Sequence, residues 1–133
     1  MALVLCLGSD ESLIRTRTLL LERAGHKVVS VRNVRDIEQV CRQHAFDVAV
    51  IGQGIPPPER FRIADVLREL CPDAAVLELF TISSPAVLDS ATDSLEMSGA
   101  QPSELAEKVS ALAATRKSSG AKKMRKAKAP KSE

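Results

Sequence analysis

Residues 47–57 have the sequence DVAVIGQGIPP, and the apolar run within this stretch ends at Gly52. In an open parallel sheet, ligands and reacting groups lie at the carboxyl ends of the strands, and glycine brings no side chain to that place. The Gly-Gln-Gly sequence of residues 52–54 is not interpreted as a phosphate loop. It runs into Ile-Pro-Pro-Pro rather than into a helix N-terminus, and it lacks the G-x-x-x-x-G-K pattern.

The histidines and cysteines form no catalytic or metal-binding motif. His26 follows a glycine turn and His44 closes a predicted helix, where a cation suits the helix dipole, so both are interpreted as structural or exposed residues. The cysteines at positions 6, 41 and 71 are odd in number, widely spaced and set in apolar patterns. We predict buried thiols in a reducing cytoplasm rather than a metal site or a redox pair.

Glu78 is an acid inside a predicted strand of apolar neighbours. A buried carboxylate without a partner is costly. We therefore expect Glu78 to reach a partner such as an arginine, or to lie near the edge of the sheet. The functional alternative is an acid in a ligand pocket.

The composition is that of one α/β domain with an aliphatic core. Of the 133 residues, 44% are hydrophobic, and the only aromatic residues are three phenylalanines. The N-terminal apolar run is short and has no basic region before it, so we expect no signal peptide. No stretch approaches the roughly 20 apolar residues of a membrane span.

The net charge of +2 is unevenly distributed along the chain. Residues 117–133 hold seven basic residues and one acid, a charge of +6, and subtracting this from +2 leaves −4 for residues 1–116. We predict one domain over residues 1–116 and a disordered tail over residues 117–133, because the tail has almost no apolar periodicity. The tail could contact phosphate groups or act only as a solubilising segment. Its candidate polyanion-binding residues are Lys122, Lys123, Arg125, Lys126 and Lys128.

Apolar runs and amphipathic segments alternate along the domain. Strands are predicted over residues 2–7, 27–31, 46–51, 74–80 and 95–97, and helices over residues 10–24, after Asn33, over 59–70, from Ser84-Pro85, and from Gln101-Pro102. Five such units with short connections predict a doubly wound parallel five-stranded sheet with helices on both faces, an αβα sandwich.

Four segments resemble the receiver domain of response regulators, the flavodoxin-like (βα)5 module of two-component signalling with strand order 2-1-3-4-5. The segments are GSDESLIRTRTLLLERAGHKV, HAFDVAVIGQGIPP, RELCPDAAVLELFT and SGAQPSELAEKVSALA, and the likeness spans about residues 2–116. The resemblance implies an aspartate that accepts a phosphoryl group after the third strand and an acidic pair that holds Mg²⁺ after the first. It also implies a Ser or Thr at the end of the fourth strand and a Lys after the fifth.

The acceptor position falls on Gly52, which can be neither a nucleophile nor a metal ligand. The acidic pair falls on Ser9 and Asp10. Asp10 is a weak candidate for a metal ligand, but we favour a helix N-cap for this pair, and tight Mg²⁺ binding is not expected.

The hydroxyl position falls on Phe80, or on Thr81 if the register slips by one residue, and the lysine position falls on Ser98. Such a slip would turn every side chain of the strand to the other face. The phosphorylation pocket is therefore degenerate.

The sequence predicts a non-phosphorylatable pseudo-receiver that is not an enzyme and needs no cofactor. It would act as a protein–protein interaction module in two-component or phosphorelay regulation, binding a kinase, a regulator or a second copy through its last two βα units. The alternative is binding of nucleic acid or another polyanion by the basic tail. A third possibility is a small-molecule pocket at the strand ends, where flavodoxin-like folds bind flavin.

Overall fold

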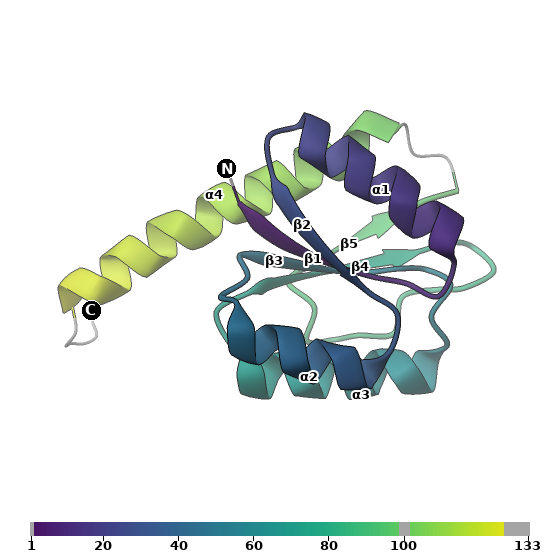
Figure 1. Ribbon diagram of the computed structural model, residues 1–133, viewed down its shortest axis with the longest axis horizontal. Helices are drawn as coiled ribbons and strands as arrows, with labels where there is room; N and C mark the ends of the chain where they lie inside the picture. Colours follow the sequence, from purple (N-terminus) through teal and green to yellow (C-terminus); the bar gives the residue numbers. More distant parts are fainter. Residues whose placement is uncertain (1, 99–101, 127–133) are drawn as a thin grey trace.

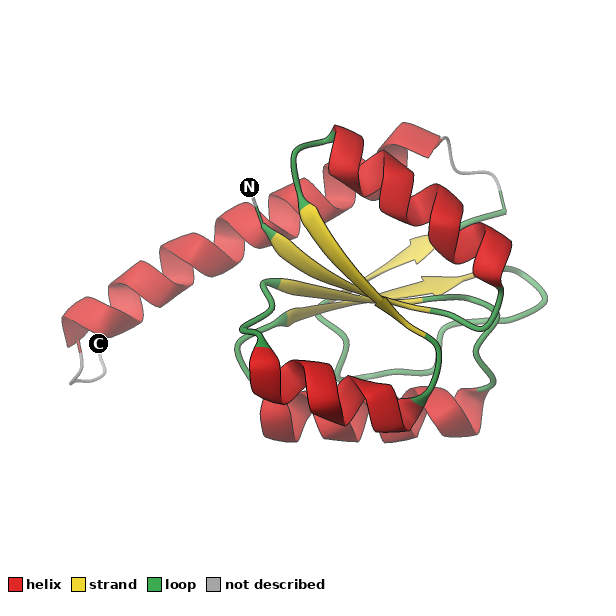
Figure 2. Cartoon of the chain, in the orientation of Figure 1, coloured by secondary structure: helices red, strands yellow, loops and turns green. Residues whose placement is uncertain are grey.

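The computed structural model describes residues 2–98 and 102–126, with side chains up to Thr115. The described residues alternate between strands and helices (Figures 1 and 2). In chain order the elements are β1 (Leu3–Leu7), α1 (Glu11–Arg23), β2 (Lys27–Val31), α2 (Val34–Gln43), β3 (Val48–Ile51), α3 (Pro57–Leu70), β4 (Ala75–Phe80), β5 (Asp93–Glu96) and α4 (Pro102–Lys126).

The five strands form one parallel sheet in the order β2-β1-β3-β4-β5, which confirms the predicted fold class. Helices α1 and α4 cover one face of the sheet, and α2 and α3 cover the other (Figure 1). Leu7 pairs with Ile51, and Ile51 pairs with Glu78, so the carboxyl ends of β1, β3 and β4 meet at one edge.

An aliphatic core lies on each side of the sheet. On one side, Leu5 and Ile51 pack with Ile37 of α2 and Leu67 of α3. On the other side, the buried side chains of β1, β3 and β4 pack against Leu21 of α1 and Leu105, Val109 and Ala113 of α4. Burial on both faces explains why β1 and β3 are continuous apolar runs.

The helix starts follow the capping signals of the sequence. The side chain of Asp10 accepts hydrogen bonds at the N-terminus of α1, and Asn33 does the same for α2 by accepting from the N–H of Asp36 at 3.0 Å. Helix α3 begins with prolines at its first positions, where the missing N–H is not needed.

One predicted feature of the second half of the chain differs in the structure. The predicted short helix at Ser84-Pro85 is wrong, because residues 81–92 form a loop in which Leu88 turns inward and is buried. Helix α4 continues to Lys126 and runs beyond the sheet (Figure 1), and the domain boundary at residue 116 stays a prediction. The Ala, Lys and Arg residues of this segment are good helix formers, and residues 127–133 of the predicted tail lie outside the described residues.

None of the helices in the described part of the chain has the length and apolar character that a membrane crossing requires.

Candidate functional site at the carboxyl edge of the sheet

Gly52 stands directly after β3, where no side chain would fit. Its N–H donates to the carbonyl of Leu7 at 2.8 Å, which draws the two strand ends together. A Cβ at this position would lie 2.9 Å from the Leu7 carbonyl oxygen and 2.9 Å from Nη1 of Arg17. Glycine at the predicted acceptor position therefore permits a close backbone approach that any other residue would disturb.

The guanidinium of Arg17 lies beside Gly52. Arg17 projects from the inner face of α1, is only 5% exposed, and donates through Nη2 to the side-chain oxygen of Gln53. Burial lowers its pKa, an effect that the nearby Cys6 and Asp10 oppose. The positive charge at this strand end disfavours a divalent cation in the same place.

Asp10 and Ser9 bond to backbone groups of their own region and are not arranged as a pair of metal ligands. The Asp10 carboxylate accepts from the N–H of Ser12 at 2.9 Å and of Leu13 at 3.3 Å, which confirms the predicted N-cap. The Ser9 hydroxyl donates to the carbonyl of Gly54 at 3.3 Å. Within residues 2–98 and 102–126 there is no cluster of three or more His, Cys, Asp or Glu side chains suited to a metal ion.

Arg60 and Glu78 form an ion pair with no exposed side-chain surface, at 2.9 Å between Nη1 and Oε2. Arg60 also donates to the carbonyls of Ile55 at 2.7 Å and Gln53 at 2.8 Å, and to the Ser84 hydroxyl at 2.7 Å. A second bond from Nη1 reaches the Pro85 carbonyl at 3.0 Å. The pair thus joins the loop after β3 to the loop after β4.

Glu78 completes this network from the strand side. Its carboxylate oxygens accept from the N–H of Val87 at 2.9 Å and of Leu88 at 3.0 Å. These bonds tie the backbone of residues 87–88 to β4, which explains why no helix forms there. The prediction that Glu78 reaches an arginine is confirmed, and β4 is not an edge strand because β5 pairs with its outer side. Both oxygens are engaged within the protein, so the alternative of a ligand-pocket acid is not supported.

Sequence reasoning did not single out Arg60 as a buried residue. The signal was present, because Arg60 precedes Ile63, Ala64 and Leu67 at helical spacing and therefore lies on the buried face of α3.

The remaining predicted site residues lie at the same edge, toward β5. Phe80 is the last residue of β4 and pairs with Glu96. The Thr81 hydroxyl accepts from the N–H of Ser84 at 3.0 Å, so it closes a turn. Ser98 is exposed, and its N–H donates to the Glu96 carboxylate at 2.9 Å. The structure thus places Arg17 beside Gly52 and Ser9 beside Gly54, while Thr81 and Ser98 are bonded within their own loops.

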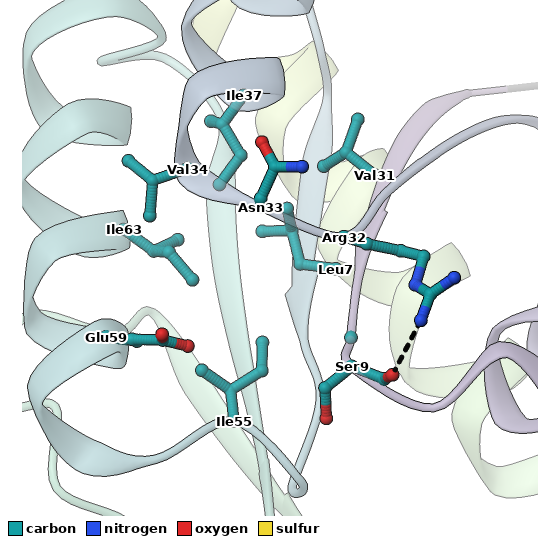
Figure 3. A pocket seen from close by; sticks show the side chains of 11 residues that line it. Leu7, Ser9, Val31, Arg32, Asn33, Val34, Ile37, Ile55, Glu59 and Ile63 are labelled. Atoms are coloured by element: carbon teal, nitrogen blue, oxygen red, sulfur yellow. Dashed lines mark hydrogen bonds between the residues drawn. The ribbon is translucent and has the colours of Figure 1, made fainter.

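A separate apolar cavity of about 70 Å³ opens between α2 and α3 (Figure 3). Ile37 and Ile63 line it, and Arg32 crosses its mouth to donate to the Ser9 carbonyl at 3.5 Å. Ligand pockets usually measure about 300–1,000 Å³. This cavity is thus far too small for a flavin.

The histidines and cysteines have the structural roles predicted for them. The N–H of Ala2 donates to Nδ1 of the buried His26 at 3.2 Å, and the ring of His44 contacts that of Phe46 at 5.7 Å between centroids. All three cysteines are buried and free. Burial raises the pKa of Cys6 to about 11 and that of Cys41, which also interacts with Cys71, to about 12.

A scan against protein-family models finds no match, and a search of curated proteins also finds none. Solved structures do match. A protein described as adenylate cyclase from Rhodopirellula baltica superposes with a TM-score of 0.82 at 16% identity, covering 96% of this chain and 98% of that one. A response regulator receiver domain protein from Clostridium thermocellum gives 0.72 at 18% identity, with 88% and 98% covered.

A third match is a structure of the histidine kinase ThkA in complex with the response regulator TrrA, with a TM-score of 0.69, 19% identity, and coverage of 84% and 98%. At sequence identities of 16%, 18% and 19%, these structural matches establish the fold alone. The strand order, the helices on both faces and the superpositions agree, and the chain has the fold of a response-regulator receiver domain.

Proposed function

We propose that this chain is a receiver-like module that cannot be phosphorylated and that acts by binding a protein partner, with no catalysis of its own. The observation that carries the proposal is the occupation of the acceptor position. Gly52 offers no carboxylate, and the Arg17 guanidinium lies where a side chain at position 52 would project. Neither a phosphoryl group nor Mg²⁺ has an acidic ligand to bind at the end of β3.

The two loops that would have to move in a phosphorylation switch are bonded to each other. Arg60 and Glu78 connect Gln53 and Ile55 on one loop with Ser84, Pro85, Val87 and Leu88 on the other. A buried pair of this kind resists separation, because each charge would lose its partner away from water. We infer a domain held in one conformation, or shifted only by a partner that binds two conformations unequally.

We assign the partner surface to β4, β5, their connecting loop and the part of α4 before residue 117. The loop presents Ile82, which is 85% exposed. Helix α4 is attached to β5 by the ion pair of Lys108 with Asp93 at 2.9 Å. The matched kinase complex supports a protein partner in general, and the specific proposal is a kinase, a regulator or a second copy of this chain. The free buried thiols support a reducing compartment such as the cytoplasm.

Incubation with acetyl phosphate and Mg²⁺ tests the loss of phosphorylation. We expect no mass increase by intact-protein mass spectrometry and unchanged amide NMR spectra, because no carboxylate is available at position 52. A phosphorylatable receiver domain treated in the same way serves as the positive control. A covalent phosphoryl adduct on this chain would refute the proposal.

The second candidate function is polyanion binding by the tail, which the charge of +6 over residues 117–133 favours. Deleting these residues should abolish binding to duplex DNA and leave partner binding intact. Replacing Lys122, Lys123 and Lys126 by Gln in the full chain is the matched control, and it should lower the salt dependence of DNA binding by about one unit of log slope per lost phosphate contact. Loss of partner binding on deletion would mean that the domain is not the interaction surface.

A further inference from the structure

Two of the three cysteines contact each other between α2 and α3. Cys41 belongs to the last turn of α2, and Cys71 is the C-cap of α3, where its N–H donates to the Leu67 carbonyl at 2.7 Å. Both side chains belong to one buried core cluster, and the Cys41 thiol is hydrogen-bonded to that of Cys71. The two helices lie side by side on one face of the sheet (Figure 1). The sequence alone favours separate buried thiols, whereas the fold brings these two together.

The Cys41–Cys71 pair is open to small reagents, although little of it is exposed. Cys41 is 6% exposed and Cys71 is 8% exposed, whereas Cys6 of β1 has no exposed surface. A surface hollow of about 360 Å³ is lined by Cys41 and Cys71 together, and this volume lies in the usual range of small-molecule sites. Cys71 also lines a second hollow, of about 160 Å³, between α3 and the loop after β4. A reagent therefore has room to reach this pair but not Cys6.

The contact favours a disulfide over a metal site. Within the described segments, no His, Cys, Asp and Glu side chains form a cluster of three, which a bound ion would need. Two cysteines can be bridged without moving the backbone only where their side chains already meet, as these two do. Burial and the hydrogen bond with Cys71 raise the pKa of the Cys41 thiol to about 12, so the shared proton stays on Cys41. Cys71, the more exposed of the two, is therefore the attacking sulfur.

We propose that Cys41 and Cys71 form a reversible disulfide that crosslinks α2 to α3 when the chain meets a small oxidising disulfide of the glutathione class. Cys71 loses its proton to solvent, and its sulfur attacks one sulfur of the reagent, which breaks the S–S bond of the reagent and releases one glutathione thiolate. Cys41 then loses its proton, and its sulfur attacks Cys71 in the mixed disulfide, which releases the second glutathione. The protein loses two protons and two electrons, and the two glutathione thiols gain them. This site does not involve position 52, so it goes beyond the proposed function and does not depend on it.

The test is incubation of the folded full chain with oxidised glutathione at about pH 8, where an ordinary cysteine thiol is partly ionised. We expect the intact mass to fall by about 2 Da, the mass of the two hydrogen atoms that are lost. After the remaining thiols are blocked, trypsin should release peptides 36–42 and 69–108 joined to each other, since these hold Cys41 and Cys71. Dithiothreitol should separate the peptides and restore the original mass.

Cys6→Ala is the matched control, and it should form the same joined peptides at a rate within twofold of the wild type. Cys41→Ala and Cys71→Ala should each lose the joined pair, and should either fail to fold, the peptide map of the wild type decides. The crosslink should raise the melting temperature by about 5–15 °C, because it restricts the unfolded chain. The proposal is overturned if the joined peptides do not form, if peptide 1–15 with Cys6 is joined instead, or if the melting temperature does not rise.

Discussion

At the scale of single residues, the structure explains the glycine that stands where a reactive acid is expected. Gly52 is required by a close approach of β1, β3 and α1, and not by an unusual backbone angle, since Gly25 alone among the glycines in the described segments has a positive φ. The glycine at position 52 is therefore part of the packing of the domain.

Gly52→Ala should destabilise the fold by about 1–3 kcal/mol, the usual cost of forcing extra atoms into a packed site. The added Cβ would meet the Leu7 carbonyl, which cannot move without displacing β1. Urea unfolding measures the change. Gly54→Ala is the control, because its Cβ would meet only the movable Ser9 hydroxyl at 3.3 Å, and its free energy of unfolding should stay close to that of the wild type. Equal effects of the two substitutions would contradict this account.

At the scale of elements, a buried ion pair holds a loop where the sequence predicts a short helix. The loop after β4 has no helical backbone bonds, and its N–H groups at Val87 and Leu88 donate to the Glu78 carboxylate instead. Since Arg60 holds the same carboxylate and the loop after β3, the two loops depend on one side-chain network.

Glu78→Gln should lower the free energy of unfolding by about 3–5 kcal/mol, because it leaves the Arg60 charge buried without a partner. Asp65→Asn is the matched control on α3, since it removes an exposed ion pair with Arg68 and should cost less than about 1 kcal/mol. Hydrogen exchange at Val87 and Leu88 should accelerate in the first variant only. Unchanged protection of these amides would show that the loop is held by other contacts.

The sequence predicted the elements with strong local signals and missed those decided by distant side chains. Asp10 and Asn33 are recognisable from the local sequence as N-caps of their helices. The strands β1 and β3 are recognisable as continuous apolar runs. Ser84-Pro85 carries an equally good helix start, but Arg60, 24 residues away from Ser84, takes its hydroxyl and bonds the Pro85 carbonyl. Similarly, the glycine at the end of β3 is visible in the sequence, whereas the placement of Arg17 beside it depends on the packing of α1.

At the scale of the whole molecule, the buried thiols make stability sensitive to alkaline pH. The pKa of Cys6 rises from 9.0 to about 11 and that of Cys41 to about 12, so the folded state binds these protons more tightly than the unfolded chain. Their contribution to stability is present below pH 9 and is lost as the pH rises through the folded values.

The melting temperature should therefore fall between pH 9 and pH 11. Cys6→Ala should flatten this dependence even if it lowers stability at pH 7, because it removes one of the titrating groups. Thermal unfolding monitored by circular dichroism across this range measures both effects. A dependence equally steep in the variant would mean that other groups cause it.

The crowding at Gly52 also limits which side chains this position accepts. An aspartate there would stand against a backbone carbonyl and a guanidinium that already fill its surroundings. To admit it, α1, β1 and the loop after β3 would have to shift together. A single substitution at residue 52 is therefore felt at once by two strands and a helix, and tolerance at this position depends on its neighbours rather than on the loop that contains it.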